Sequence, residues 1–218
     1  MKFKTIISAL LVAVLAIATA DVTAKVYTEK EMKQFAKLAA KSAKSRAKQL
    51  QKEKWVYSGT ADLQYKLEMI LLKTEEFGGD CVERVAEISD APTVAIGEKL
   101  ARSSVEQDIS REIRTMIKGI IDTHTKVDSR YHNDVYIDNW TAQVAQELNG
   151  NVQKSLVLYK KNKDNTYTVR VVFLTSIDAR RIALESLARE ITDDNELAAA
   201  IRAAALGTDP TAVPVAEE

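Results

Sequence analysis

Both histidines of the chain, His124 and His132, lie in the stretch DTHTKVDSRYHND, which spans residues 122–134. Imidazoles and carboxylates this close in sequence are the side chains that build zinc sites and hydrolytic sites. The two histidines are eight residues apart and straddle the expected end of a helix, so one helix cannot present both to one ion. His124 also continues an isoleucine stripe at helical spacing, which predicts a place on a core face. A metal-dependent enzyme using residues 122–138 therefore stays an alternative interpretation.

Calcium is the other metal that this region could suggest, because it contains Asp122, Asp128, Asp134 and Asp138. An EF-hand loop needs closely spaced Asp or Asn residues followed by a glycine, and that spacing is missing. Aspartates in such connections commonly accept local backbone hydrogen bonds. The sequence also lacks the nucleophile-elbow, P-loop and dinucleotide-binding motifs, and it has only seven glycines. We therefore predict no catalytic residue, no metal, no cofactor and a protein that is not an enzyme.

Hydrophobic spacing predicts the elements that would position these residues. Helices are expected where apolar side chains recur every three or four positions, and strands where they alternate. Gly119 lies inside the longest predicted helix, which indicates close packing against a neighbour. Cys81 is predicted to be an ordinary half-buried strand residue. The predicted elements are helices at 28–53, from Thr60 to Gly78, at 93–126, from an Asn139 cap to Gly150, from Thr175 to 191 and from Asp193 to Gly207, with strands at 54–59, 81–89, 153–161 and 166–176.

This order of elements predicts an α+β fold: a long helix and shorter helices packed on one face of a small, mainly antiparallel sheet with a C-terminal hairpin. The tyrosines at 57, 131, 136, 159 and 167 could rim a pocket, although such residues more often pack on sheets. The predicted division is a signal peptide at 1–20, a basic N-terminal helix at 21–54, an α+β core domain at 55–192, and an alanine-rich helix with a disordered acidic tail at 193–218.

The first twenty residues predict the compartment. Lys2 and Lys4 precede an apolar run that ends in Ala18-Thr19-Ala20, the pattern of a cleaved secretory signal. We expect an exported protein, periplasmic or at the cell surface, with no transmembrane span after cleavage. Its only cysteine is Cys81, so lipidation at the N-terminus and an internal disulfide are not expected.

Charge is distributed unevenly along the chain. Residues 25–54 contain ten Lys or Arg and three Glu, whereas residues 185–218 contain eight acidic residues and two arginines. The basic helix could be a solvated helix packed through its alanines, a surface for an anionic lipid or acidic envelope polymer, or a dock for the acidic end of this or another copy. Export argues against nucleic acid as the partner. The candidate anionic-surface residues are Lys33, Lys37, Lys41, Lys44 and Lys48.

The segments KSAKSRAKQLQKEKWVYSG, IGEKLARSSVEQDISREIRTMIKGIID and DNTYTVRVVFL occur in the order of a known group of proteins. Over residues 40–190 the chain resembles poorly characterised Gram-negative envelope proteins, similar to small surface lipoprotein antigens related to flagellar-assembly accessory proteins. Ala101, Val105, Ile109 and Glu112-Ile113 would occupy the long-helix pattern of that family. The lipidated cysteine of the lipoprotein members is missing here. The resemblance implies an envelope location and a structural or binding role, with no catalytic residues.

The function that the sequence favours is an exported, non-catalytic cell-envelope protein with a structural or protein/envelope-binding role. One alternative is adhesion or anionic-surface binding through the basic N-terminal helix, and the other is the metal-dependent enzyme. Expected partners are an envelope protein or an anionic envelope component. The chain could also form a homo-oligomer.

Overall fold

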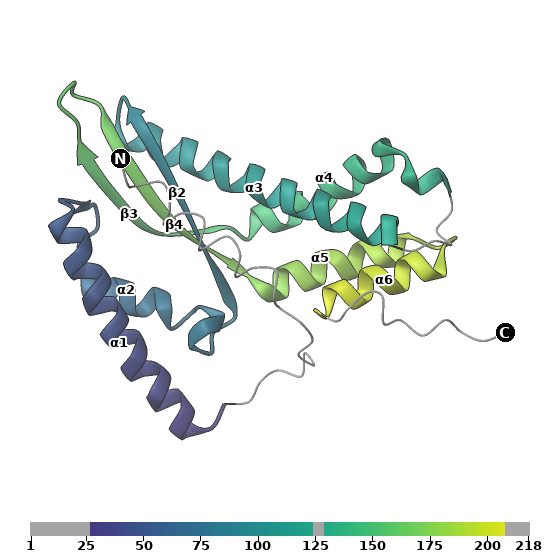
Figure 1. Cartoon of the computed structure of the whole chain (residues 1–218), viewed down its shortest axis with the longest axis horizontal. Coiled ribbons are helices and arrows are strands. Elements are labelled where there is room, and N and C mark those ends of the chain that lie inside the picture. The colour runs from purple at the N-terminus through teal and green to yellow at the C-terminus, as the bar shows by residue number, and fades with distance from the viewer. Residues whose placement is uncertain (1–26, 124–128, 208–218) are drawn as a thin grey trace.

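The computed structural model describes residues 27–123 and 129–207, and the predicted signal peptide, His124 and the predicted tail from residue 208 lie outside them. Within these residues, six α-helices and four strands make up an α+β fold, as predicted (Figure 1). Within the described ranges no helix is both long and apolar enough to cross a membrane. In chain order the elements are α1 (Glu29–Lys52), β1 (Val56–Tyr57), α2 (Leu63–Leu71), the 3₁₀ turn η2 (Glu75–Phe77), β2 (Cys81–Ala91), α3 (Val94–Thr123), the 3₁₀ turn η3 (Ser129–His132), α4 (Asp134–Gly150), β3 (Gln153–Lys161), β4 (Tyr167–Ser176), α5 (Ile177–Glu190) and α6 (Asn195–Ala205).

The four strands form one antiparallel sheet in the order β1-β3-β4-β2. The predicted hairpin is confirmed as β3 and β4, joined by a turn in which Asn165 has a φ of 65°. Asparagine tolerates that left-handed conformation better than most residues. The strand predicted at 81–89 is confirmed as β2, which lies at one edge of the sheet and pairs only with β4 among the described strands.

Helices cover both faces of the sheet, so the prediction that they pack on one face was wrong. Figure 1 shows α1 and α2 on one side and α3 on the other. The reason lies in β4, where apolar side chains occupy both faces instead of alternating with polar ones. Tyr167, Val169, Val171 and Phe173 face α3, while Val172 and Leu174 face α1 and α2. Two hydrophobic cores result, separated by the sheet.

The larger core is organised around α3. Its buried side chains recur at helical spacing through six turns and pack against the sheet, α4, α5 and α6. Gly97, near the start of α3, lies against Val169 of β4, but a Cβ added at Gly119 would meet no atom within 4 Å. Close packing was therefore the wrong explanation for Gly119. The buried residues of α3 beyond Gly97 are Ala101, Val105, Ile109, Ile113, Ile117, Ile120 and Ile121.

Several helices begin one or more residues away from the predicted cap. Thr28 caps α1 with a reciprocal capping box to Glu31, as its sequence pattern predicted. Elsewhere a nearby residue has the extended backbone and side-chain oxygen that a cap requires. Asn133 caps α4, so the predicted cap Asn139 lies inside that helix. The other observed caps are Asp62 instead of Thr60, Ser176 instead of Thr175, and Asp194 instead of Asp193.

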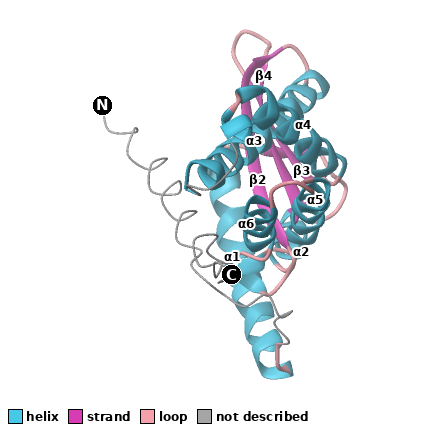
Figure 2. Ribbon diagram, turned by 90° about the vertical axis from the view of Figure 1, so that its right-hand side faces the viewer, coloured by secondary structure: helices cyan, strands magenta, loops and turns pink. Residues whose placement is uncertain are grey.

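The smaller core attaches α1 to the sheet. Buried alanines of α1, together with Leu50, meet α2 and the leucines of β3 and β4. Trp55 completes this core, 6% exposed, with the Nζ of Lys160 4.1 Å and the Cζ of Arg170 4.3 Å from its ring centroid. Both cations therefore lie within the distance at which they are attracted to the face of the indole ring. α1 nevertheless extends past the rest of the described fold, as Figure 2 shows from the side.

Candidate functional site

The five predicted surface lysines of α1 lie on one stripe of the helix. Lysines occur at 30, 33, 37, 41, 44, 48 and 52, at intervals of three or four residues, so the stripe also includes Lys30 and Lys52. At about 100° per residue these positions fall within an arc of roughly 100° of the helix circumference. All seven side chains are exposed. We call this set the lysine stripe.

The lysine stripe lies away from the face by which α1 is held. Ala39, Ala43 and Ala47 are buried and project toward the opposite part of the helix circumference. Arg46 lies on the buried side as well and forms an ion pair with Glu83 of β2 at 3.0 Å. The stripe is therefore carried on a helix whose rotation about its own axis is fixed by packing and by a cross-element ion pair.

Within the described residues, the lysine stripe is nearly free of counter-charges. Lys33 forms an ion pair with Glu29 at 2.5 Å, and the other six lysines form none with any residue that the structure describes. The second acidic residue of the first turn, Glu31, is held by Thr28, whose backbone and hydroxyl hydrogen bonds lower the pKa of its carboxyl. Over a span of roughly 33 Å, at 1.5 Å per residue, the stripe presents one ammonium group about every 5 Å.

The described aspartates of the 122–138 region and His132 form contacts between α3 and the segment that comprises η3 and α4. Asp134 and Asp138 of α4 both accept hydrogen bonds from Arg114 of α3, at 2.9 Å and 2.8 Å. The Nδ1 of His132 is 4.0 Å from Asp122, and both side chains are exposed. Over residues 27–123 and 129–207, no three His, Cys, Asp or Glu side chains are placed to hold a metal ion. His124 and Asp128 lie outside these ranges.

An aromatic cluster stands beside those aspartates. Tyr131 is buried, and its ring contacts Tyr136 and Trp140 at centroid distances of 5.5 Å and 5.2 Å. The Tyr131 hydroxyl donates to Asp193, in the connection between α5 and α6, at 2.5 Å. Burial, followed by this hydrogen bond, raises the pKa of Tyr131 to about 12. The tyrosine therefore stays protonated and joins η3 to the α5–α6 connection.

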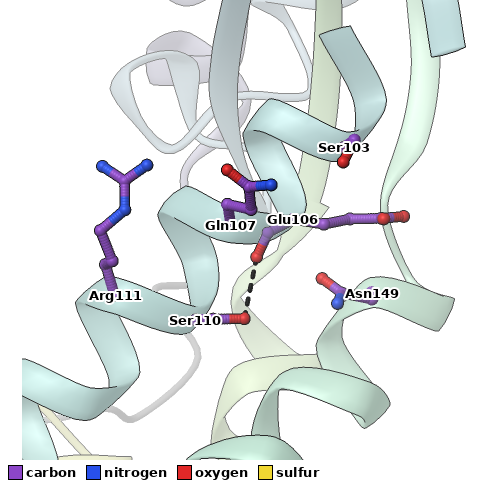
Figure 3. Close-up of a pocket in the computed structure, with 6 residues that line it drawn as sticks. All are labelled: Ser103, Glu106, Gln107, Ser110, Arg111 and Asn149. Atoms are coloured by element: carbon purple, nitrogen blue, oxygen red, sulfur yellow. Dashed lines mark hydrogen bonds between the residues drawn. The ribbon is translucent and has the colours of Figure 1, made fainter. Parts of the chain in front are cut away.

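A polar hollow of about 340 Å³ lies between α3 and the end of α4 (Figure 3). Much of its hydrogen-bonding capacity is already used, because Ser110 donates to the backbone carbonyl of Glu106 and Arg102 binds the Glu106 carboxylate. The sequence carries no signal for this hollow, since its residues come from the polar side of one helix and the end of another. Ser103, Glu106, Gln107, Ser110, Arg111 and Asn149 line it.

Cys81 is half-buried at the start of β2, as predicted. Burial, and then a hydrogen bond to Asp80, raises the pKa of its thiol to about 11. A thiol with that pKa is almost entirely protonated near neutral pH, so Cys81 is a poor nucleophile.

No model of a known protein family matches the chain, and no match was found among curated proteins or among solved structures. The resemblance to envelope lipoprotein antigens therefore stays a prediction.

Proposed function

We propose that this is an exported, non-catalytic cell-envelope protein that binds an anionic envelope component through the lysine stripe of α1. The single observation that supports this proposal is the exposure of seven lysines along one side of an anchored helix, six of them without an ion pair among the described residues. The ligand chemistry that fits is a repeating series of phosphate or carboxylate groups. Lipid headgroups and soluble acidic polymers share that chemistry.

The mode of binding follows from the opposite face of α1. An amphipathic helix that inserts into a membrane interface needs its apolar face free to enter the lipid. From Ala39 onward the apolar face of α1 is occupied, because Ala39, Ala43, Ala47 and Leu50 pack within the smaller core. The exposed apolar residues Met32 and Leu38 are confined to the first part of the helix. Binding through this helix is therefore electrostatic and superficial. Salt should weaken it strongly, because ions screen exposed charges over about 10 Å at 0.1 M.

A solvated helix face with no ligand is the competing explanation. The two explanations differ in whether binding depends on where the lysines lie. If the face is only solvated, removing lysines from the stripe should affect binding no more than removing the same number elsewhere. Rigid spacing favours the proposal: a pre-positioned row of ammonium groups loses less conformational freedom on binding than the same lysines on a flexible segment.

The test compares two variants with the same change in net charge. The stripe variant carries Lys37→Gln, Lys41→Gln, Lys44→Gln and Lys48→Gln. The control variant carries four changes of exposed lysines on α3 and the hairpin that also lack ion pairs among the described residues. These are Lys99→Gln, Lys118→Gln, Lys161→Gln and Lys163→Gln.

Binding is measured by co-sedimentation with vesicles containing phosphatidylglycerol and by fluorescence titration with long-chain polyphosphate, each at low and high salt. A lysine near an anionic surface contributes about 1 kcal/mol, so losing four should weaken binding at low salt on the order of a thousandfold. The control variant should stay within a few-fold of the unmodified protein. Vesicle binding alone would identify lipid headgroups as the source, and polyphosphate binding alone a soluble polymer. Equal losses in both variants, or no binding to either probe, would refute the proposal.

A further inference from the structure

The outer edge of β2 is open over its central residues. Asp80 accepts a backbone hydrogen bond from Ile177 on the β4 side, whereas the N–H of Cys81 donates to Lys73 on the other side. Because backbone groups of an antiparallel strand alternate between its two neighbours, even-numbered residues of β2 bond to β4 and odd-numbered residues face outward. The open stretch therefore begins after Cys81.

Glu83, Val85 and Glu87 are the outward-facing residues of this stretch. Among the described residues, no backbone partner binds their outward N–H and C=O groups. The regular pairing of β2 with β4 ends at a bulge after Ile88. The open ladder thus offers three consecutive outward-facing residues, which is enough for a short added strand.

The usual protections of an edge strand are weak in β2. Natural edge strands are often blocked by proline, by lysine or by unpaired charges. The sequence of β2, CVERVAEISDA, contains no proline or lysine. Three of its charged side chains are each neutralised by a residue from another element. These ion pairs are Arg46–Glu83 at 3.0 Å, Arg170–Glu87 at 2.6 Å and Arg84–Glu112 at 2.8 Å.

Apolar side chains are exposed along the same edge. Val85 is 53% exposed on the side of the sheet that faces α1, and Val82 is 41% exposed on the other side. Both are β-branched residues that favour strands and gain from a cross-strand neighbour. An added strand would cover both of them.

We infer that β2 pairs antiparallel with β2 of a second copy of this chain, about a two-fold axis that passes through Val85. The two Val85 side chains then lie opposite each other, and Val82 lies opposite Ile88 of the second copy. Glu83 lies opposite Glu87 of the second copy, each already neutralised by its own arginine. Glu83, Val85 and Glu87 form three hydrogen-bonded pairs, each exchanging two backbone bonds.

Other registers fit less well. A two-fold axis through Glu83, Arg84 or Glu87 would place two identical charged side chains directly opposite each other, which destabilises a pair of strands. An axis through Ala86 would place Val85 opposite a glutamate and carry the pairing into the bulge. The register centred on Val85 is the one that matches the two exposed valines with apolar partners.

The first experiment removes the outward N–H at the axis. Proline lacks a backbone N–H and is tolerated on an edge strand where that group faces outward. Val85→Pro should therefore retain the β2–β4 ladder but abolish the dimer, whereas Val85→Thr, which keeps a β-branched side chain and the N–H, should stay dimeric. Sedimentation equilibrium gives the molar mass of each, and circular dichroism checks the fold. A monomeric unmodified protein, or a folded dimeric Val85→Pro variant, would overturn the inference.

The second experiment measures the register by oxidation. In a Cys81→Ser background, Val85→Cys should form an intermolecular disulfide, because hydrogen-bonded pairs have Cα atoms about 5.5 Å apart, within the range that disulfides accept. The matched control is Val82→Cys in the same background. In the proposed register, position 82 of one copy and position 82 of the other lie six residues apart along the strands, roughly 20 Å. The two cysteines should therefore stay unlinked. Absence of the Val85→Cys cross-link, or equal cross-linking of both variants, would overturn the proposed pairing. This test does not depend on whether the Val85→Pro variant folds.

Discussion

Two glycines of α3 are expected to respond in opposite directions to replacement by alanine. At Gly97 an added Cβ would lie 2.4 Å from Cγ2 and 2.7 Å from Cβ of Val169, and 3.2 Å from Cβ of Ala91. At Gly119 an added Cβ would meet no atom within 4 Å. The two substitutions are chemically identical and lie in one helix, so the difference between them reports the packing of α3 on the sheet.

The expected magnitudes follow from these contacts. Alanine at Gly119 should stabilise the protein by about 0.8–1.0 kcal/mol, the difference in helix propensity. Overpacking of a core costs about 1–3 kcal/mol. The upper end of this range applies at Gly97. Cβ of Val169 is fixed to the backbone of an internal strand, and Val169 is fully buried. After the propensity gain, Gly97→Ala should destabilise the protein by about 2 kcal/mol.

Urea unfolding followed by circular dichroism measures both changes. For a protein of this size, 1 kcal/mol shifts the melting temperature by about 2–4 °C, so thermal melts should separate the two variants clearly. A Gly97→Ala variant as stable as the unmodified protein would refute the close approach of α3 to β4. A destabilised Gly119→Ala variant would show instead that a neighbour contacts the helix there.

Three further outcomes are expected. Trp55→Ala should destabilise the protein by about 3–5 kcal/mol in urea unfolding, because the buried indole and its cation–π contacts are lost together. Tyr131→Phe should lower the melting temperature near neutral pH, and this decrease should become smaller as the pH falls. The Tyr131 hydrogen bond lowers the pKa of Asp193 below its ordinary 3.8, so this stabilisation is present above that pH and is lost as the pH falls through the folded value. Cys81, whose thiol pKa is about 11, should react with an aromatic disulfide reagent at pH 8 about tenfold more slowly in the folded protein than in denaturant.

Most elements of the fold could be predicted from hydrophobic spacing. The long helix, the hairpin and the capping box of α1 rest on local patterns that tertiary contacts reinforce. The two-sided packing of the sheet could not be derived in the same way, although β4 carries its signal. Val171, Val172, Phe173 and Leu174 form a continuous apolar run, which indicates a strand buried on both faces. That run outweighs the alternation seen elsewhere in the strand.

Cap positions and Gly119 were mispredicted for a different reason. The N-cap is the last residue with extended backbone before the helix begins. In a polar connection several residues carry a side-chain oxygen that could accept the capping hydrogen bond. Asn133 and Asn139 are two such residues, and Asn133 is the cap in the structure. A glycine within a helix has no sequence signal that distinguishes tight packing from open space. Gly97 and Gly119 show both situations in one helix.

For the candidate site, the spacing of the lysine stripe could be predicted from the sequence, whereas the contacts of the 122–138 region could not. Asp134 and Asp138 were candidates for metal chemistry by composition alone, and their shared partner Arg114 lies twenty or more residues earlier in the chain. Ion pairs between helices have no local sequence signature. The polar hollow between α3 and α4 has none either, for the same reason.

Arg46 connects the two proposed surfaces of the molecule. Its guanidinium is one of the contacts that hold α1 over the sheet, and it also neutralises Glu83 on the open edge of β2. In a sheet extended through two copies of β2, the axis is perpendicular to the sheet, so both α1 helices and both lysine stripes lie on the same side. Arg46→Gln would leave an uncompensated carboxylate beside the dimer axis, and we expect it to weaken pairing of the copies while every lysine of the stripe is still present. Because two stripes on one side can engage one anionic surface together, loss of pairing should then weaken binding to vesicles more than binding to short anions.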